Sequence, residues 1–199
     1  MMIISVIVLF ATALVTISSC SQKNERPSRE AVSNNGWEVS FFPALEERTR
    51  EVGLPKLERN VAGASDLELR FWYDAHPNLI NGFVIRRTGD VWSARGIRQS
   101  QNWWPSPLIQ DALGAPKSGW DAFWKKLTDA GMLTLPDSYE INCTSGALDG
   151  GAYVVEVLTK EGYRTYRYDN PQLGACTEAK IMVSIEAILA HEFTITPSQ

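Results

Sequence analysis

The chain has 199 residues and a formal net charge of -4, with 19 lysines and arginines scattered among 23 aspartates and glutamates. Binding to a phosphate backbone calls for a concentrated basic surface, so this composition argues against nucleic acid as a partner. Hydrophobic residues make up 44% of the chain and aromatic residues 10%, which is typical of a folded globular protein and excludes a largely disordered one.

Residues 1–19 carry no charged side chain and are mostly apolar, as in a secretory signal peptide. The run is shorter than the about 20 apolar residues of a membrane span, so we expect cleavage. The stretch Ile17-Ser18-Ser19-Cys20 resembles the lipobox of bacterial lipoproteins. This resemblance implies that Cys20 carries lipid, and that Ser21 directs the protein to the outer membrane, facing the periplasm. An ordinary cleaved signal with an incidental cysteine is the alternative.

Residues 20–35 are polar, with almost no apolar side chain to offset the entropy of ordering. We interpret them as a flexible tether that spans on the order of 20 Å and holds a domain clear of a membrane. The remainder, residues 36–199, is long enough for a single globular domain with one core.

The first strands follow from alternation of apolar and polar side chains. Residues 66–74 alternate in this way, and two further strands, 79–88 and 91–98, flank a two-residue turn at Gly89-Asp90. That turn predicts a hairpin with Arg87 opposite Trp92, and with the apolar residues of both strands on one face.

Residues 103–119 are rich in proline and are interpreted as an ordered crossing loop. A helix is expected next, with Ser118 as its N-cap and Gly131 at its end. Trp92, on the inward face of the hairpin, is expected to join the core. The buried stripe of this helix consists of Trp120, Phe123, Trp124 and Leu127.

A second hairpin is predicted from residues 152–159 and 163–168, and a last amphipathic helix from about Thr177 to His191. Every tight connection in this order is a hairpin. The expected class is therefore α+β, an antiparallel sheet built from hairpins with two amphipathic helices packed on one face.

Cys143 and Cys176 remain once Cys20 is lipidated, and an isolated pair in an oxidising compartment predicts a structural disulfide. The alternative is a redox or metal pair, which neither a C-x-x-C spacing nor accompanying histidines support. We therefore expect no metal and no cofactor.

No linear motif of a known catalytic site occurs, and His76 and His191 are the two histidines of the chain. Carboxylates can still converge in space, and Asp149, Glu140 and Glu156 are the candidates for such a site. Trp103 and Trp104 are the candidate binding residues, because neighbouring side chains on extended chain point to opposite sides, so that both are buried only if the chain is covered on both faces. The alternative is a loop that packs both of them onto the core.

The part of the chain from Trp120 onward also resembles a family of uncharacterised bacterial proteins, many of them lipoproteins. The resemblance implies an envelope location and supports the limits of the domain, but it carries over no catalytic residue. The matching residues are Trp120, Trp124 and Leu127, then Ala130-Gly131-Met132, Leu135-Pro136-Asp137, Asp149-Gly150, Tyr153-Val154-Val155-Glu156, Tyr163-Arg164-Thr165-Tyr166-Arg167-Tyr168, Asn170-Pro171 and Cys176.

Two functions stay open at this point. The first is a noncatalytic envelope lipoprotein that is held to the membrane by lipid on Cys20 and binds an envelope protein, a glycan or another ligand. The second is a periplasmic hydrolase that uses Asp and Glu carboxylates.

The anchor is tested by the variant Cys20→Ser. We expect it to take up no labelled palmitate in a bacterial host and to remain unprocessed or soluble, because lipid transfer requires the thiol of this residue. Wild-type protein without label would show that Cys20 merely lies close to an ordinary cleavage site.

Overall fold

The computed structural model describes residues 36–57, 66–76, 79–100, 106–147 and 150–193. Cys20 and the expected signal peptide and tether lie outside these ranges. The elements in chain order are α2 (Trp37–Arg50), β1 (Leu67–His76), β2 (Leu79–Thr88), β3 (Val91–Gln99), β4 (Leu108–Leu113), α3 (Trp120–Asp129), β5 (Ala152–Thr159), β6 (Tyr163–Asp169), the short 3-10 helix η2 (Pro171–Leu173) and α4 (Thr177–Phe193).

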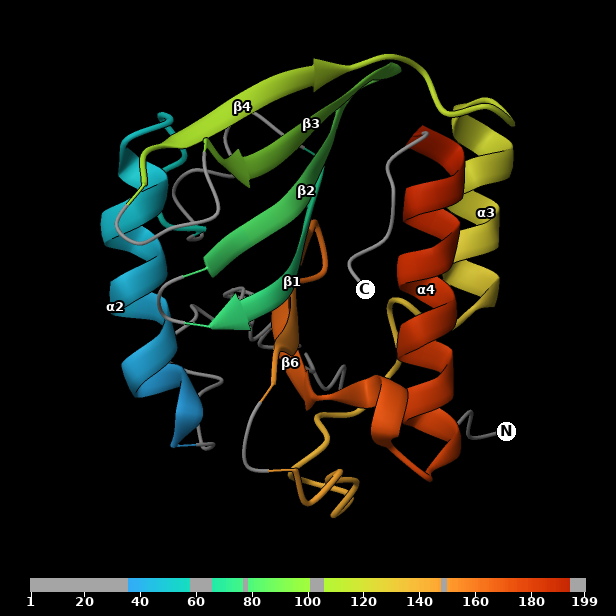
Figure 1. The fold of residues 1–199 in the computed structure, drawn as a ribbon. Coiled ribbons are helices and arrows are strands. Elements are labelled where there is room, and N and C mark those ends of the chain that lie inside the picture. Colours follow the sequence, from blue (N-terminus) through green and yellow to red (C-terminus); the bar gives the residue numbers. More distant parts are fainter. Residues whose placement is uncertain (1–35, 58–65, 77–78, 101–105, 148–149, 194–199) are drawn as a thin grey trace, which may run out of the picture.

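The six strands form one antiparallel sheet in the order β4-β3-β2-β1-β5-β6, with β1 near the centre (Figure 1). The register of the first hairpin is as predicted, with Arg87 opposite Trp92 and Ile85 opposite Ala94. The second hairpin pairs β5 with β6. The prediction of an α+β fold whose antiparallel sheet is built from hairpins is confirmed.

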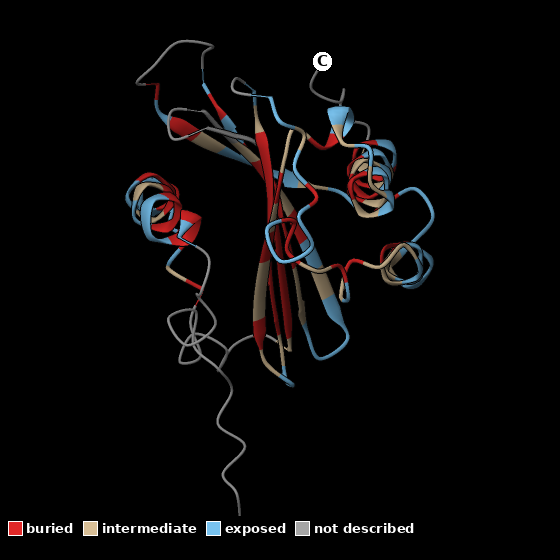
Figure 2. Cartoon of the chain, turned by 90° about the horizontal axis from the view of Figure 1, so that it is seen from below, coloured by how far each residue is buried: buried red, intermediate tan, exposed pale blue. Residues whose placement is uncertain are grey.

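Helices cover both faces of this sheet. Figure 2 shows the sheet edge-on, with α2 on one side and the other two long helices on the opposite side. The main core lies between the sheet and α3 and α4, where Phe71 and Val155 meet Phe123 and Ile185. The sequence predicts two helices on one face and no helix before β1, so α2 and the layer it forms are additions to that prediction.

Two local predictions were wrong. The expected crossing loop contains β4, which pairs with β3 along the edge of the sheet. The expected N-cap Ser118 does not cap α3. Gly119 holds that position without a side-chain cap, and its φ of 80° is a conformation that favours glycine. The backbone N–H of Ser118 instead donates to Glu192 of α4, at 2.9 Å.

Helix α2 packs on its face of the sheet through an aromatic cluster. Trp37, Phe41 and Phe42 contact one another and lie over Trp72 and Val84. The indole N–H of Trp37 donates to the Asp137 carboxylate at 3.3 Å. Apolar contacts with the sheet and one hydrogen bond to Asp137, in the segment after α3, thus hold α2 in place.

The same face of β1 also buries charge. Glu68 is 3% exposed and accepts hydrogen bonds from Arg70 at 2.7 Å and from Arg86 at 2.8 Å. Arg70, 1% exposed, also donates to the carbonyl of Pro55. Burial alone raises the pKa of Glu68, but the two guanidinium groups outweigh it and hold this pKa below its usual value. These charges are therefore paired, as buried charges must be.

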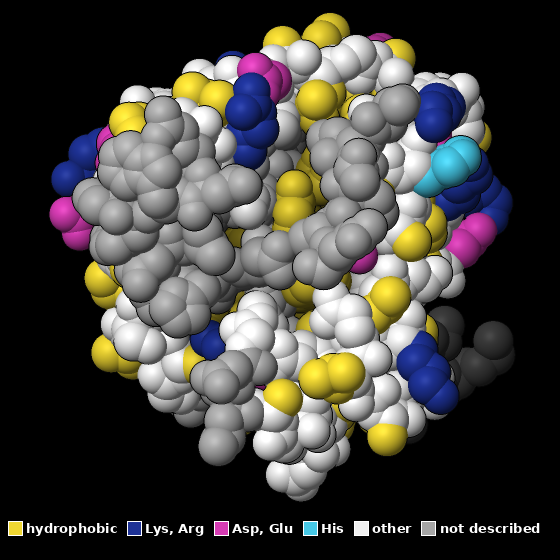
Figure 3. All heavy atoms as spheres, viewed as in Figure 1, with side chains coloured by type: hydrophobic (Ala, Val, Ile, Leu, Met, Phe, Trp, Pro, Cys, Tyr) yellow, Lys and Arg dark blue, Asp and Glu magenta, His cyan; other side chains and the backbone are white. Residues whose placement is uncertain are grey.

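Among the described helices, none combines the length and the apolar character that crossing a membrane requires. Figure 3 shows basic and acidic side chains in small separate groups on the face seen in Figure 1, with hydrophobic side chains between them.

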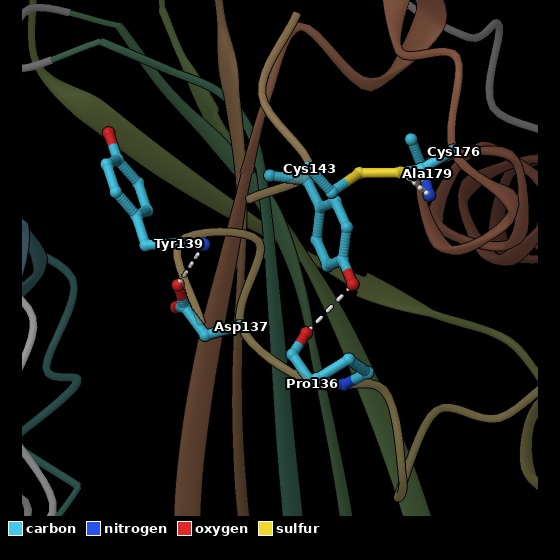
Figure 4. The surroundings of a disulfide bond; sticks show 7 residues. Pro136, Asp137, Tyr139, Cys143, Cys176 and Ala179 are labelled. Atoms are coloured by element: carbon cyan, nitrogen blue, oxygen red, sulfur yellow. Dashed lines mark hydrogen bonds between the residues drawn. A yellow bond between two sulfur atoms is a disulfide. The ribbon is translucent and has the colours of Figure 1, made fainter. Parts of the chain in front are cut away.

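The structure joins Cys143 to Cys176, whose Cα atoms are 6.0 Å apart (Figure 4). Cys143 follows the turn that Asp137 stabilises by accepting the N–H of Tyr139 at 2.9 Å. Cys176 immediately precedes α4, and its sulfur accepts the N–H of Ala179 at 3.3 Å. The bond therefore ties the start of α4 to the segment that precedes the second hairpin.

We expect non-reducing mass spectrometry of the oxidised protein to find the peptides of Cys143 and Cys176 joined. In the double variant Cys143→Ser, Cys176→Ser, the free energy of unfolding should be lower by about 2 to 5 kcal/mol, because the unfolded chain is no longer constrained by the closed loop. Two free thiols in native, oxidised protein would contradict this prediction and reopen the case for a reactive or metal-binding pair.

Candidate functional site

A hollow of about 700 Å³ opens at the end of the sheet where the β2–β3 turn lies. Figure 1 shows the first turn of α3 at this same end of the molecule. Four segments far apart in the sequence meet here, namely the start of β1, the β2–β3 hairpin, the β5–β6 turn and the start of α3. The residues that line the hollow are Asp66, Arg87, Gly89, Asp90, Trp92, Trp120, Asp121 and Lys160.

The carboxylate of Asp66 holds one wall of the hollow together. It accepts the N–H of Gly89 at 2.7 Å and pairs with the ammonium of Lys160 at 2.8 Å. The hydrogen bond from Lys160 and then that from Gly89 lower the pKa of Asp66 below its usual value. This residue thus joins β1 to both hairpin turns and neutralises Lys160.

Two tryptophans form the aromatic wall. Trp92 and Trp120 stack with ring centroids 5.5 Å apart and planes within 5° of parallel. Hairpin register places Arg87 beside Trp92 on the same face, and its guanidinium carbon lies 5.2 Å from the centre of that ring. Such cation–π contacts orient a guanidinium without using its N–H groups.

These tryptophans were expected to be core residues, and this is only partly right. Trp92, Trp120 and Trp124 pack against the main core, but each stays half-buried. The reason is position, since Trp120 is the first residue of α3 and Trp92 is the second residue of β3. Both rings therefore lie at the end of the sheet and stay partly accessible to solvent.

Arg87 differs from its neighbour Arg86. The guanidinium of Arg86 forms two hydrogen bonds to Glu68. The Nε of Arg87 is buried and finds no partner, and no ion pair of this guanidinium occurs within the part of the chain that the structure describes. A buried donor without an acceptor costs about 1 to 3 kcal/mol. Among the residues that line the hollow, Arg87 is thus one with a buried donor left without an acceptor.

Another hollow, of about 490 Å³, lies beside the β5–β6 turn and is lined by Leu133, Val157 and Tyr163 among others. Its arginine, Arg164, donates to the carbonyls of Leu133 and Leu135. Because the guanidinium of Arg164 already donates to two backbone carbonyls, this hollow has fewer free hydrogen-bond donors for a ligand than the hollow at Arg87.

The two candidate carboxylates that the structure describes, Glu140 and Glu156, do not form a pair that flanks a cleft. Glu156 is fully buried on the α2 face, where it accepts hydrogen bonds from Trp72 at 2.9 Å and Tyr163 at 3.2 Å. Glu140 lies exposed in the turn after α3, and Asp149 lies outside the described residues. Glu156 therefore has a structural role in anchoring Trp72.

The other predicted site residues give no further candidate. Trp103 and Trp104 lie outside the described ranges, as does Cys20. Within those ranges, no three His, Cys, Asp or Glu side chains come close enough together to hold a metal ion.

The contrast between the two arginines is testable by urea unfolding. Arg86→Met should lose about 1 to 3 kcal/mol of the free energy of unfolding, because it removes hydrogen bonds to a buried carboxylate. Arg87→Met should change that free energy by less than about 0.5 kcal/mol or raise it, because methionine keeps the packing on Trp92 and removes an unpaired donor. Equal losses in both variants would show that Arg87 is a structural residue.

Comparisons of the chain with protein-family models, with curated proteins and with solved structures find no match. The lipobox at Cys20 and the family resemblance of the C-terminal part stay predictions.

Proposed function

We propose that this chain is an envelope lipoprotein, anchored by lipid on Cys20, whose domain is a noncatalytic binding module. Its binding site is the hollow lined by Arg87, Trp92 and Trp120. The anchor rests on the sequence, in the stretch Ile17-Ser18-Ser19-Cys20.

The observation that carries the binding role is the state of Arg87. Its guanidinium carbon lies 5.2 Å from the centre of the Trp92 ring, the residue lines the hollow, and its buried Nε has no hydrogen-bonding partner in the described structure. Buried unsatisfied groups are rare in folded proteins, and departures of this kind are expected at functional or strained sites. The hollow also has the size of small-molecule binding sites, which span about 300 to 1,000 Å³.

A noncatalytic role is favoured by what lies around Arg87. The carboxylate of Asp66, which lines the same hollow, already pairs with the ammonium of Lys160 and accepts a hydrogen bond from the N–H of Gly89. Asp90 and Asp121 are exposed at the rim. General acid catalysis requires a carboxyl group whose pKa is raised by its surroundings, and the pKa of Asp66 is instead lowered.

Photo-crosslinking in living cells tests this proposal on the full chain. A photoreactive benzoylphenylalanine in place of Asp90 should give a defined adduct with an envelope component, because this position is on the rim of the hollow. The matched control is the same group in place of Val39, which is 75% exposed on α2, across the sheet. We expect no adduct from that position.

The dependence on Arg87 decides the outcome. Adding Arg87→Met should abolish the adduct from position 90, whereas Arg98→Met, at an exposed position of β3 outside the hollow, should leave it unchanged. Equal adducts from positions 90 and 39, no adduct from position 90, or an adduct that survives Arg87→Met would each refute a binding role of the hollow.

A further inference from the structure

We infer that the end of the domain opposite the hollow rests on the membrane that holds the lipid of Cys20. The apolar end surface that makes this contact consists of the exposed side chains of Tyr139, Ile141 and Leu173. This inference rests on the proposed lipid anchor and adds the orientation of the anchored domain, in which the hollow points away from the membrane.

Three of the five large hydrophobic side chains that are exposed in the described chain belong to this surface. Tyr139, Ile141 and Leu173 are 44%, 38% and 68% exposed. The other two are Val39, on α2, and Val91, at the β2–β3 turn. Single exposed apolar residues are common, but a group of them in one place marks a contact with a partner or a membrane.

Strand β6 and helix α4 place these residues away from the hollow. β6 starts at the β5–β6 turn, which borders the hollow, and ends at Asp169, which accepts the hydroxyl of Tyr139 at 2.8 Å. Helix α4 starts beside η2, which contains Leu173, and ends at Phe193, whose ring lies 6.3 Å from that of Trp120 in the hollow. Figure 1 shows the first turn of α4 at the end opposite the first turn of α3.

The disulfide fastens the two segments that carry the apolar end surface to each other. Ile141 precedes Cys143 by two residues, and Leu173 precedes Cys176 by three. The Cα atoms of the two cysteines are 6.0 Å apart (Figure 4). The N–H of Cys143 also donates to the carbonyl of Ser138 at 2.8 Å, which closes the first segment into a turn. The exposed side chains therefore lie on neighbouring segments that are held in place.

This surface is apolar rather than basic. Residues 137–143 and 170–176 contain no lysine or arginine, so they lack the groups that attract anionic headgroups. The ring of Tyr139 is partly exposed while its hydroxyl is bonded to Asp169, and tyrosines with an apolar body and a polar tip are frequent at membrane interfaces. The surface is thus suited to the boundary between headgroups and acyl chains.

The tether determines which partner reaches this surface. It joins the domain where α2 begins, and there the indole N–H of Trp37 donates to Asp137, two residues before Tyr139. The tether predicted for residues 20–35 spans on the order of 20 Å, so the bilayer that holds Cys20 is presented to the surface at a high effective concentration. Three apolar side chains are too few to hold a free protein on a membrane, but they suffice to orient one that is already anchored.

Photo-crosslinking of the lipidated full chain in vesicles of phosphatidylethanolamine and phosphatidylglycerol tests this orientation. Benzoylphenylalanine replaces either Leu173 or, as the matched control, Val91, which are 68% and 71% exposed at opposite ends of the domain. Mass spectrometry should find at least about tenfold more phospholipid adduct from position 173 than from position 91, because only the first position is held at the bilayer.

The apolar character of the surface decides the outcome. Tyr139→Ser combined with Ile141→Ser should lower the lipid adduct from position 173 to that from position 91, whereas Val39→Ser should leave it unchanged. High salt should also leave it unchanged, because the contact is apolar. Equal lipid adducts from positions 173 and 91, an adduct that survives the double substitution or is lost in high salt, or a crosslink from position 173 to a second copy of the chain in place of lipid would each overturn the inference.

Failure of this inference can be told apart from failure of the proposed anchor. If wild-type protein takes up labelled palmitate but positions 173 and 91 give equal lipid adducts, the anchor stands and the orientation is wrong. If Cys20 takes up no label, the anchor and the orientation are both wrong.

Discussion

The alternation of side chains along β1 is the constraint on which the rest of the structure depends. Leu67, Leu69 and Phe71 point to the face under α3 and α4, which commits Glu68 and Arg70 to the opposite face. A shift of one residue would exchange the two sets and place bare charges in the main core. The hydrogen bonds of Glu68 to Arg70 and Arg86 therefore fix register as well as contribute stability, since buried charges are tolerated only in pairs.

The same register produces the candidate site. Because Arg86 lies beside Glu68 on β1, its neighbour Arg87 must point to the other face and towards Trp92 on β3. Two consecutive arginines thus have different environments, one paired with a buried carboxylate and one stacked on a tryptophan with a donor unused. The buried Nε of Arg87 lacks an acceptor in a fold whose other features agree with one another. Functional sites are expected to show local exceptions of this kind.

The sequence predicts the elements whose signals are local. Both hairpins, with their turns and register, follow from alternation and turn residues, and α3 follows from its apolar stripe and from Gly131, whose φ is 93°. It does not predict α2, because Pro43 interrupts the helical pattern and Arg48 and Thr49 are polar yet buried. Nor does it predict β4, a short edge strand with exposed residues inside a proline-rich segment.

The hollow lies beyond sequence reasoning for a different reason. Its residues lie at positions 66, 87–92, 120–121 and 160, and only the packing of α3 against the hairpin brings Trp120 to Trp92. The sequence places Arg87 opposite Trp92 but says nothing of whether an acceptor reaches it. Only in the folded chain does the buried Nε of Arg87 stand out as a donor without an acceptor beside the hollow.

The indole N–H signals of the seven tryptophans, observed by nuclear magnetic resonance, test the central claim most directly. Trp37 and Trp72 serve as internal references, since their indoles donate to Asp137 and Glu156 on the far face of the sheet. In the variant Arg87→Met, which no longer places a guanidinium over the Trp92 ring, we expect the Trp92 and Trp120 signals to shift and the reference signals to stay constant. Unchanged Trp92 and Trp120 signals, or shifts confined to the references, would contradict it.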